Sequence, residues 1–253
     1  MRRLSDIPEE ERQRAIRTRL IRMETRPSAE PLPTGFPALD AALGGGLPRG
    51  RIVEWFGPPA SGKTTLALQV VARLQRNGGT AAWIDAEHSF DPAYAGALGV
   101  IIERLLLAQP DSAEQGLEIT RQLASSGAVD WIVIDSAAAL VPKLELEAAV
   151  GVSAGLQGRI LASSLRRLSM IAARSGASLL FLNQTRSRME SSDPQAETSA
   201  GGPGLKLHSA VRIALEPAAE KHARFRVLKN KAAPAFQEGE LRWDQGLGLA
   251  ETP

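Results

Sequence analysis

The feature that most constrains the fold of this 253-residue chain is a glycine-rich run that follows an apolar segment. The run reads Gly57-Pro58-Pro59-Ala60-Ser61-Gly62-Lys63-Thr64 and fits the phosphate-binding pattern G-x-x-x-x-G-K-[ST]. Its glycines let backbone N–H groups curl around phosphate oxygens, and the helix predicted from Thr64 directs its positive end at the same oxygens. Lys63 is expected to reach the β- and γ-phosphates, and the Thr64 hydroxyl to bind Mg²⁺. Together with Thr65, the run predicts a site for the phosphates of a nucleotide.

Short apolar runs alternate with amphipathic patterns along the middle of the chain. The predicted strands are 51–56, 80–84, 131–134 and 178–182, and the predicted helices are 64–75, 114–125 and 157–174. Such alternation is typical of a parallel sheet with helices on both faces. Three later runs, at 211–215, 223–228 and 240–243, have the character of hairpin strands. The predicted fold class is therefore α/β with a mostly parallel sheet.

Residues 1–26 are predicted to form a separate helix, and the proline-rich segment 27–33 a linker. Acidic side chains fill the first turn of this helix and arginines crowd its end, as the helix dipole favours. Ile16, Leu20 and Met23 form one narrow apolar stripe. The stripe suits docking on the chain's own domain or on a neighbour, and a solvated arm is the alternative. We therefore expect two parts, an N-terminal helix with its linker up to residue 33 and a core domain from residue 34 to residue 253.

The composition excludes several kinds of site. The chain has no cysteine, which rules out disulfides, thiol nucleophiles and cysteine-based zinc sites. Its three histidines are too scattered for a metal site built from histidine. No apolar run approaches the roughly 20 residues of a membrane helix, and no apolar signal-peptide region follows the N-terminal arginine pair. We therefore expect a cytoplasmic protein with no membrane partner.

Two acidic motifs follow predicted strands and suit the chemistry of phosphate transfer. Asp135 ends the apolar run that begins at Trp131, and a carboxylate at the end of such a strand can hold Mg²⁺ through water. Asp85 and Glu87 follow the strand at 80–84, where either carboxylate could polarise the attacking water. Spacing alone does not choose between the two acids, because one of them could instead cap the next turn.

These motifs belong to a longer series that resembles the bacterial RecA recombinases in order and spacing. The segments that carry the resemblance are GPPASGKTT, WIDAEHSFDPAYAGALGV, AQPDSAEQGLEI, SGAVDWIVIDSAAALVPKLELE, FLNQTR, AGGPGLK and LKNKAAP. The resemblance covers roughly residues 34–240 and is highly specific, because so many motifs occur together. It implies the RecA-type fold of P-loop ATPases, with ATP and Mg²⁺ as cofactors.

The resemblance also implies roles for residues around the nucleotide. Glu87 corresponds to the family's water-activating glutamate. Asp91 and Tyr94 correspond to contacts on the adenine side, with the tyrosine ring stacked on the base. Gln184 corresponds to the glutamine that senses the γ-phosphate and relays its presence to a DNA-binding loop.

A pair of lysines has an implied role between subunits. Lys229 and Lys231 lie in the K-N-K motif, whose lysines in the family reach across a filament interface to the ATP of a neighbour. Without the resemblance they would simply be an exposed basic strand end. The family therefore implies self-association into a filament or ring.

The chain departs from the family pattern mainly outside the nucleotide motifs. It ends where RecA continues into a C-terminal domain, and its N-terminal helix differs in detail. The second DNA loop, 185–200, has a Ser-Ser-Asp tip at 191–193 where RecA has apolar and aromatic residues. Arg186 and Arg188 in this loop, and Arg159 directly after the first DNA loop at approximately 147–158, remain as candidates for contact with DNA phosphates.

Two hypotheses of function follow. The first is a RecA-like, DNA-dependent ATPase of DNA repair and recombination, which binds single-stranded DNA as an ATP-clamped oligomer. The second is a regulatory adaptor of the ImuA type for error-prone translesion synthesis in the DNA damage response, with a repair polymerase as its partner. The intact Lys63, Glu87 and Gln184 favour the ATPase, whereas the altered second loop favours the adaptor.

Overall fold

The computed structural model describes residues 8–11, 14, 30–147, 155–186, 198–219, 221–244 and 248–251. The chain divides into two compact units, Met1–Glu30 and Pro31–Pro253. In the first unit residues 9–11 and 14 are helical and Pro8 is not, and the other residues of the predicted N-terminal helix lie outside the described residues. The division of the chain after residue 33 stays a prediction.

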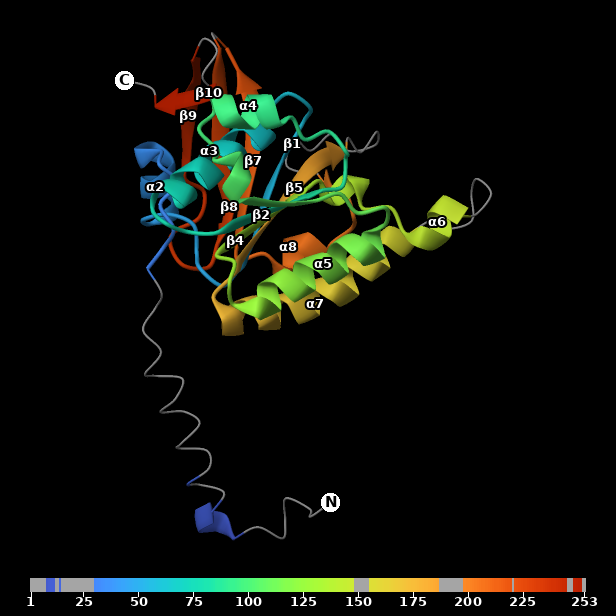
Figure 1. Ribbon diagram of the computed structural model, residues 1–253. Coiled ribbons are helices and arrows are strands. Elements are labelled where there is room, and N and C mark those ends of the chain that lie inside the picture. Colours follow the sequence, from blue (N-terminus) through green and yellow to red (C-terminus); the bar gives the residue numbers. More distant parts are fainter. Residues whose placement is uncertain are drawn as a thin grey trace. The chain divides into compact units, whose positions relative to one another are not determined.

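Within its described residues, the second unit is built on a ten-stranded sheet (Figure 1). Its strands run in the order β10-β9-β8-β7-β1-β5-β4-β2-β3, and β6 pairs with β5 outside this path. The strands are β1 (Ile52–Gly57), β2 (Ala81–Asp85), β3 (Leu105–Ala108), β4 (Trp131–Asp135), β5 (Ser178–Arg186), β6 (Thr198–Ser199), β7 (Val211–Ala218), β8 (His222–Asn230), β9 (Glu238–Asp244) and β10 (Gly248–Glu251). Neighbours from β7 to β3 are parallel, and those from β7 to β10 are antiparallel. The predicted α/β class with a mostly parallel sheet is confirmed.

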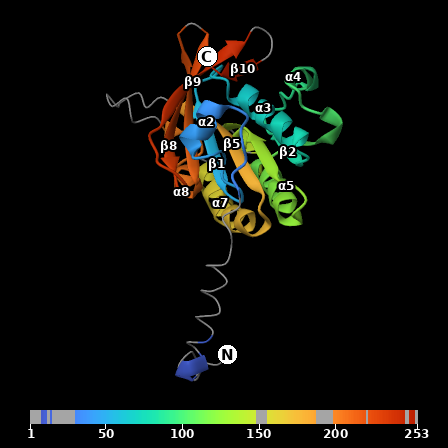
Figure 2. The same cartoon turned by 90° about the vertical axis from the view of Figure 1, so that its left-hand side faces the viewer.

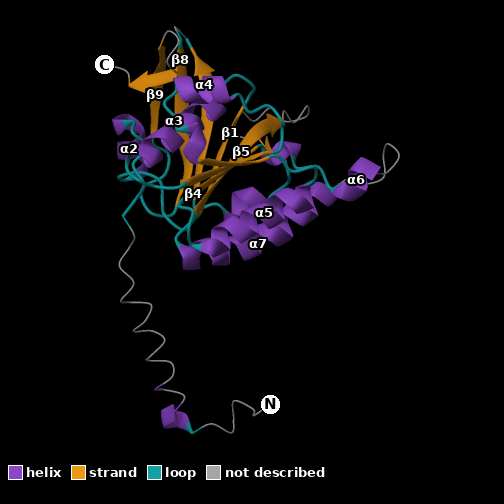
Figure 3. Ribbon diagram, in the orientation of Figure 1, coloured by secondary structure: helices purple, strands orange, loops and turns teal. Residues whose placement is uncertain are grey.

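Helices cover both faces of this sheet (Figures 2 and 3). They are α2 (Pro37–Leu43), α3 (Lys63–Arg76), α4 (Pro92–Ala97), α5 (Ala113–Ser126), α6 (Lys143–Glu147), α7 (Leu156–Ser175) and α8 (Gly204–His208), with 3-10 turns η2 (Ile102–Arg104) and η3 (Ala137–Ala139). Val53 and Trp55 of β1 pack on the side of α2, α3 and α4, while Ile52 packs on the side of α5, α7 and α8. Among the described residues, none of the helices combines the length and apolarity that a membrane span requires.

The strands and helices predicted from residue 51 onward are all present, with shifted ends. The largest difference is at β5, which continues to Arg186 instead of ending at Leu182. Its polar end stays in the sheet because Asn183 and Gln184 pair with β1, and Thr185 pairs with β6. The short elements α2, α4, β3 and β10 were not predicted, since segments of this length show no clear period.

The carboxyl ends of the central strands bring the predicted site residues to one edge of the sheet. The register places Asp85 of β2 beside Asp135 of β4, and Gly57 of β1 beside Gln184 of β5. Ligands of open α/β sheets bind at this edge, because parallel strands all end there.

Candidate nucleotide-binding site

The loop between β1 and α3 has a compact shape that its two glycines permit. A Cβ atom added at Gly57 would lie 1.9 Å from the carbonyl oxygen of Leu215, so no side chain fits there. Gly62 has a φ of 90°, and a Cβ atom on it would meet the Trp243 ring at 3.0 Å. α3 begins directly afterwards at Lys63, so the free N–H groups of its first turn face the loop. The local geometry therefore supports a phosphate site in this loop.

Lys63 is folded back onto the loop, whose tip at 58–60 is partly open to solvent. Its Nζ donates hydrogen bonds to the carbonyl oxygens of Gly57 and Pro58, at 3.1 and 2.7 Å, and to Ser61 Oγ at 3.1 Å. Burial lowers the pKa of Lys63, while two nearby carboxylates act in the opposite direction. The ammonium group thus lies in the mouth of the loop, where phosphate oxygens would replace its present acceptors.

Asp135 ends β4 and faces the first turn of α3. Its Oδ2 accepts a hydrogen bond of 3.1 Å from the Thr64 hydroxyl. Burial and then the charge of Glu87 raise the pKa of Asp135 to about 7. Nearby groups balance the negative charge of this buried carboxylate only in part, so a divalent cation would stabilise it. A hydroxyl oxygen together with a carboxylate oxygen is a ligand set that fits Mg²⁺. Within the described residues no group of three or more His, Cys, Asp or Glu side chains could hold a metal, so phosphate and water oxygens would complete the ligands.

Asp85 and Glu87, which their spacing left as alternatives, have different environments. Asp85 is 1% exposed, and its carboxylate accepts bonds from the N–H groups of Ser89 and Phe90 and from the Gln109 side chain, at 3.2, 3.0 and 2.9 Å. These bonds hold the turn after β2. Glu87 is exposed beside the phosphate loop. The geometry therefore favours Glu87 as the general base.

Glu87 is held in place by a residue to which the sequence analysis assigned no role. Ser136 Oγ donates a hydrogen bond of 2.5 Å to Glu87 Oε1, and Gln184 Nε2 lies 3.5 Å from the same oxygen. The only sequence signal for Ser136 is its place directly after Asp135 at a strand end. The predicted base and the predicted γ-phosphate sensor are thus in contact.

The residues predicted on the adenine side lie at α4. The Asp91 carboxylate caps this helix by accepting hydrogen bonds from the N–H groups of Ala93 and Tyr94, at 2.8 and 3.1 Å. Tyr94 is 41% exposed, and its hydroxyl lies 2.7 Å from Thr65 Oγ1 in α3. The ring is therefore not a core residue, and it lies open beside the phosphate loop, as stacking on a base requires.

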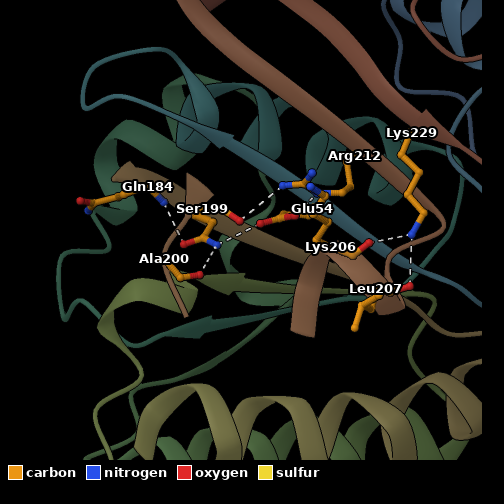
Figure 4. A network of polar contacts seen from close by, with 9 residues as sticks. Glu54, Gln184, Ser199, Ala200, Lys206, Leu207, Arg212 and Lys229 are labelled. Carbon is orange, nitrogen blue, oxygen red and sulfur yellow. Dashed lines mark hydrogen bonds and ion pairs between the residues drawn. The ribbon is translucent and has the colours of Figure 1, made fainter. Parts of the chain in front are cut away.

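The lysines of the K-N-K motif lie at the end of β8. Lys229 Nζ donates hydrogen bonds of 2.7 and 3.1 Å to the carbonyl oxygens of Lys206 and Leu207 in α8 (Figure 4). Burial and then the charge of Lys231 lower the pKa of Lys229. Lys231 itself is exposed. Within its own chain Lys229 therefore caps α8, and its reach to a neighbouring subunit stays a prediction.

The residues predicted to contact DNA are only partly described. Arg159 is exposed near the start of α7, and Arg186 is the last residue of β5, in register with Thr198 of β6. Arg188 and the Ser-Ser-Asp tip at 191–193 lie outside the described residues. The pairing of β5 with β6 brings the two ends of the second loop together.

The parallel sheet, the loop at the end of β1 and the acids at the strand ends define a P-loop ATPase of the α/β class. A family model described as the RecA N-terminal domain matches residues 8–250. The chain therefore belongs to the RecA family and is a RecA-like ATPase of DNA recombination and repair.

Individual relatives agree with this assignment. "Protein RecA" of Symbiobacterium thermophilum is 47% identical over 244 residues, which are 92% of this chain and 70% of the relative. "Protein RecA" of Thermus thermophilus is 48% identical over 230 residues, 86% of this chain and 68% of the relative. The crystal structure of the RadB recombinase shares the fold, with a TM-score of 0.70 at 22% identity over 88% of this chain and all of that one. The comparisons favour neither the adaptor alternative nor a polymerase partner.

Proposed function

We propose that this chain hydrolyses ATP with Mg²⁺, that single-stranded DNA stimulates the hydrolysis, and that ATP clamps neighbouring subunits together. The observation that carries the proposal is the meeting of four side chains at one edge of the sheet. Lys63 lies in the phosphate loop, Thr64 is hydrogen-bonded to Asp135, and Glu87 is held beside them. A cation, metal ligands and a base are the groups that phosphoryl transfer to water requires.

Each of these residues has a distinct part in the proposed reaction. Lys63 and the N–H groups at the start of α3 bind the β- and γ-phosphates. Thr64 and Asp135 would hold Mg²⁺, which would neutralise charge on the transferred phosphoryl group. Glu87 takes the proton of the attacking water, and a hydroxyl hydrogen bond of 2.5 Å fixes its carboxylate for this task. Gln184 lies 3.5 Å from that carboxylate, where it can meet the γ-phosphate.

The proposed clamp between subunits uses Lys229 and Lys231. Lys229 would exchange its two carbonyl acceptors in α8 for phosphate oxygens on the neighbour. Lys231 is exposed and needs no such release. Since each site would then contain residues of two subunits, activity should depend on protein concentration.

The proposed binding of single-stranded DNA is weak and independent of sequence. Arg159, Arg186 and Arg188 supply contacts to phosphates, which carry affinity but no sequence information. The tip at 191–193 contains two serines and an aspartate, so it offers no apolar wedge and adds negative charge. In other DNA-binding proteins, apolar side chains inserted between bases recover the cost of unstacking through apolar contacts. The tip of this loop lacks such side chains, so we expect strand exchange to be feeble.

The ATPase rate, measured with and without single-stranded DNA over a range of protein concentrations, tests this proposal. We expect DNA to raise the rate, and the rate per subunit to rise steeply with protein concentration. A rate per subunit that stays constant on dilution would contradict the shared site. Absence of DNA binding at low salt, with ATP and Mg²⁺ present, would favour the adaptor function instead.

A matched pair of substitutions tests the choice of base. Glu87→Gln keeps the shape of the side chain and removes its basicity, so turnover should fall by about 100-fold or more while an ATP analogue still binds. Asp85→Asn should mainly loosen the turn that Asp85 holds through its backbone acceptor bonds. If the folded Asp85→Asn variant loses more turnover than Glu87→Gln, Asp85 is the base.

A further inference from the structure

A charged pair lies in the middle of the sheet, beneath the nucleotide site. Glu54 of β1 and Arg212 of β7 are in register, and Arg212 Nε donates a hydrogen bond of 2.5 Å to Glu54 Oε2. The two residues are 0% and 6% exposed. The guanidinium carbon also lies 4.6 Å from the centre of the Phe56 ring. Buried charges are stable only when they are paired and hydrogen-bonded. Loss of either partner would leave an unpaired charge in the interior, so both side chains are held firmly in place.

Asn183 joins this pair to the nucleotide site. Its Nδ2 donates to Glu54 Oε1 at 3.0 Å and to the carbonyl oxygen of Ala200 at 2.9 Å. Its Oδ1 accepts a hydrogen bond of 2.9 Å from the N–H of Gln184. The N–H of Ala200 in turn donates to the carbonyl oxygen of Gln184 at 3.0 Å. Both backbone polar groups of Gln184 are therefore tied to Asn183 or to the end of the second loop.

Arg212 reaches the same loop and the strand of the K-N-K motif. Its terminal nitrogen lies 3.4 Å from Ser199 Oγ in β6. In the register of β7 with β8 it stands beside Lys229, whose ammonium group caps α8 after the second loop. The charges of Lys231 and Arg212 add to burial in lowering the pKa of Lys229. The Arg212 side chain thus contacts Glu54 in β1 and Ser199 at the end of the second loop, and its position in β7 lies beside Lys229 in β8.

We propose that Glu54 and Arg212 are positioning residues that hold Gln184 through Asn183 and couple it to the end of the second DNA loop. The inference rests on the proposed function in taking Gln184 as the residue that meets the γ-phosphate. The inference names the residues that connect the second loop to Gln184. DNA bound to this loop would move Ser199 and Ala200, and through their hydrogen bonds the backbone of Gln184. The buried pair makes the connection stiff, since breaking any one bond leaves a polar group without a partner in a dry interior.

Arg212→Lys tests this role, with Arg226→Lys as its matched control. Lysine keeps the positive charge but cannot reach Glu54 and Ser199 at once. Arg226 forms an ion pair with Glu216 on the same two strands, β7 and β8, away from Asn183. Both substitutions remove a guanidinium from an ion pair, but only one of them touches the network.

Two measurements are made on each variant. The first is hydrogen exchange at the Gln184 and Ala200 amides, which needs neither DNA nor nucleotide. We expect exchange to be about tenfold faster in Arg212→Lys and unchanged in Arg226→Lys. The second is the factor by which single-stranded DNA changes the affinity for a non-hydrolysable ATP analogue. This factor should fall by about fivefold or more in Arg212→Lys alone.

The outcomes separate this inference from the proposed function. Unchanged exchange at both amides would overturn the positioning role, and faster exchange with an intact DNA effect would overturn the coupling role. If DNA has no effect on the wild type while exchange is still faster in Arg212→Lys, the proposed function fails and the positioning role stands. Asn183→Ser leaves the ion pair in place and should reproduce both effects, which guards against a variant that merely fails to fold.

Discussion

The raised pKa of Asp135 makes the stability of the nucleotide-free protein depend on pH, and one substitution should remove that dependence. The folded-state pKa is about 7 because of burial and the charge of Glu87, whereas an unfolded aspartate has a pKa of about 3.9. Between these values the folded chain binds a proton that the unfolded chain does not. The free energy of unfolding therefore falls as the pH rises through this window.

The size of the effect follows from the separation of the two pKa values. About three units at about 1.4 kcal/mol each give up to about 4 kcal/mol, lost between about pH 4 and about pH 7. Asp135→Asn removes the titrating group and keeps an oxygen that can accept the Thr64 hydrogen bond. Relative to the wild type, this variant should gain stability as the pH rises to about 7 and gain nothing further above it.

Urea unfolding of both proteins at several pH values measures this difference, and titrating groups that do not interact with Asp135 cancel in the comparison. The Glu87→Gln variant gives a second check. Glu87 contributes to the raised pKa of Asp135. When both proteins also carry Glu87→Gln, the difference between their free energies of unfolding should therefore level off at a lower pH. A difference between wild type and Asp135→Asn that is constant from about pH 4 to about pH 8 would refute the reasoning.

Four further predictions concern nucleotide, subunits and DNA. Lys63→Ala should abolish binding of a non-hydrolysable ATP analogue in calorimetry, because it removes the one cation in the phosphate loop; near-wild-type affinity would rule out the assigned site. The double variant Lys229→Ala, Lys231→Ala should lose ATPase activity and recover part of it on mixing with Lys63→Ala, since each protein supplies what the other lacks; no recovery would argue against action between subunits. Binding of single-stranded DNA should weaken with salt at a log–log slope of roughly −2 per subunit, from about −0.7 for each of three arginine contacts. Asp193→Phe should strengthen that binding without changing nucleotide affinity in the absence of DNA, and unchanged DNA affinity would show that a missing wedge is not the cause.

Much of the nucleotide site could be predicted because its residues are consecutive. The two glycines, Lys63 and Thr64 lie within eight residues, so local geometry alone brings them together. The central strands were predictable for a related reason. A strand buried on both faces is mostly apolar, and such runs stand out in a sequence.

The choice between Asp85 and Glu87 shows where local reasoning stopped. Their spacing places both acids after the same strand and does not indicate which of them activates the attacking water. Only the resemblance to RecA favoured Glu87. The structure adds a physical reason. Gln109 and the turn after β2 occupy the Asp85 carboxylate, whereas Ser136, from another strand end, reaches Glu87. These partners depend on which strands are neighbours, which spacing along the chain does not reveal.

Local patterns in the sequence were therefore sufficient to predict the phosphate loop, the fold class and the order of its elements. Only the tertiary structure unites Glu54, Asn183 and Arg212, since the second and third lie 129 and 158 residues beyond the first. The sequence shows that Glu54 lies inside an apolar strand, but it does not show that Arg212 is the cation that pairs with it. The strand order β7-β1-β5 brings that cation to it, and this order arises from the packing of helices on both faces of the whole sheet.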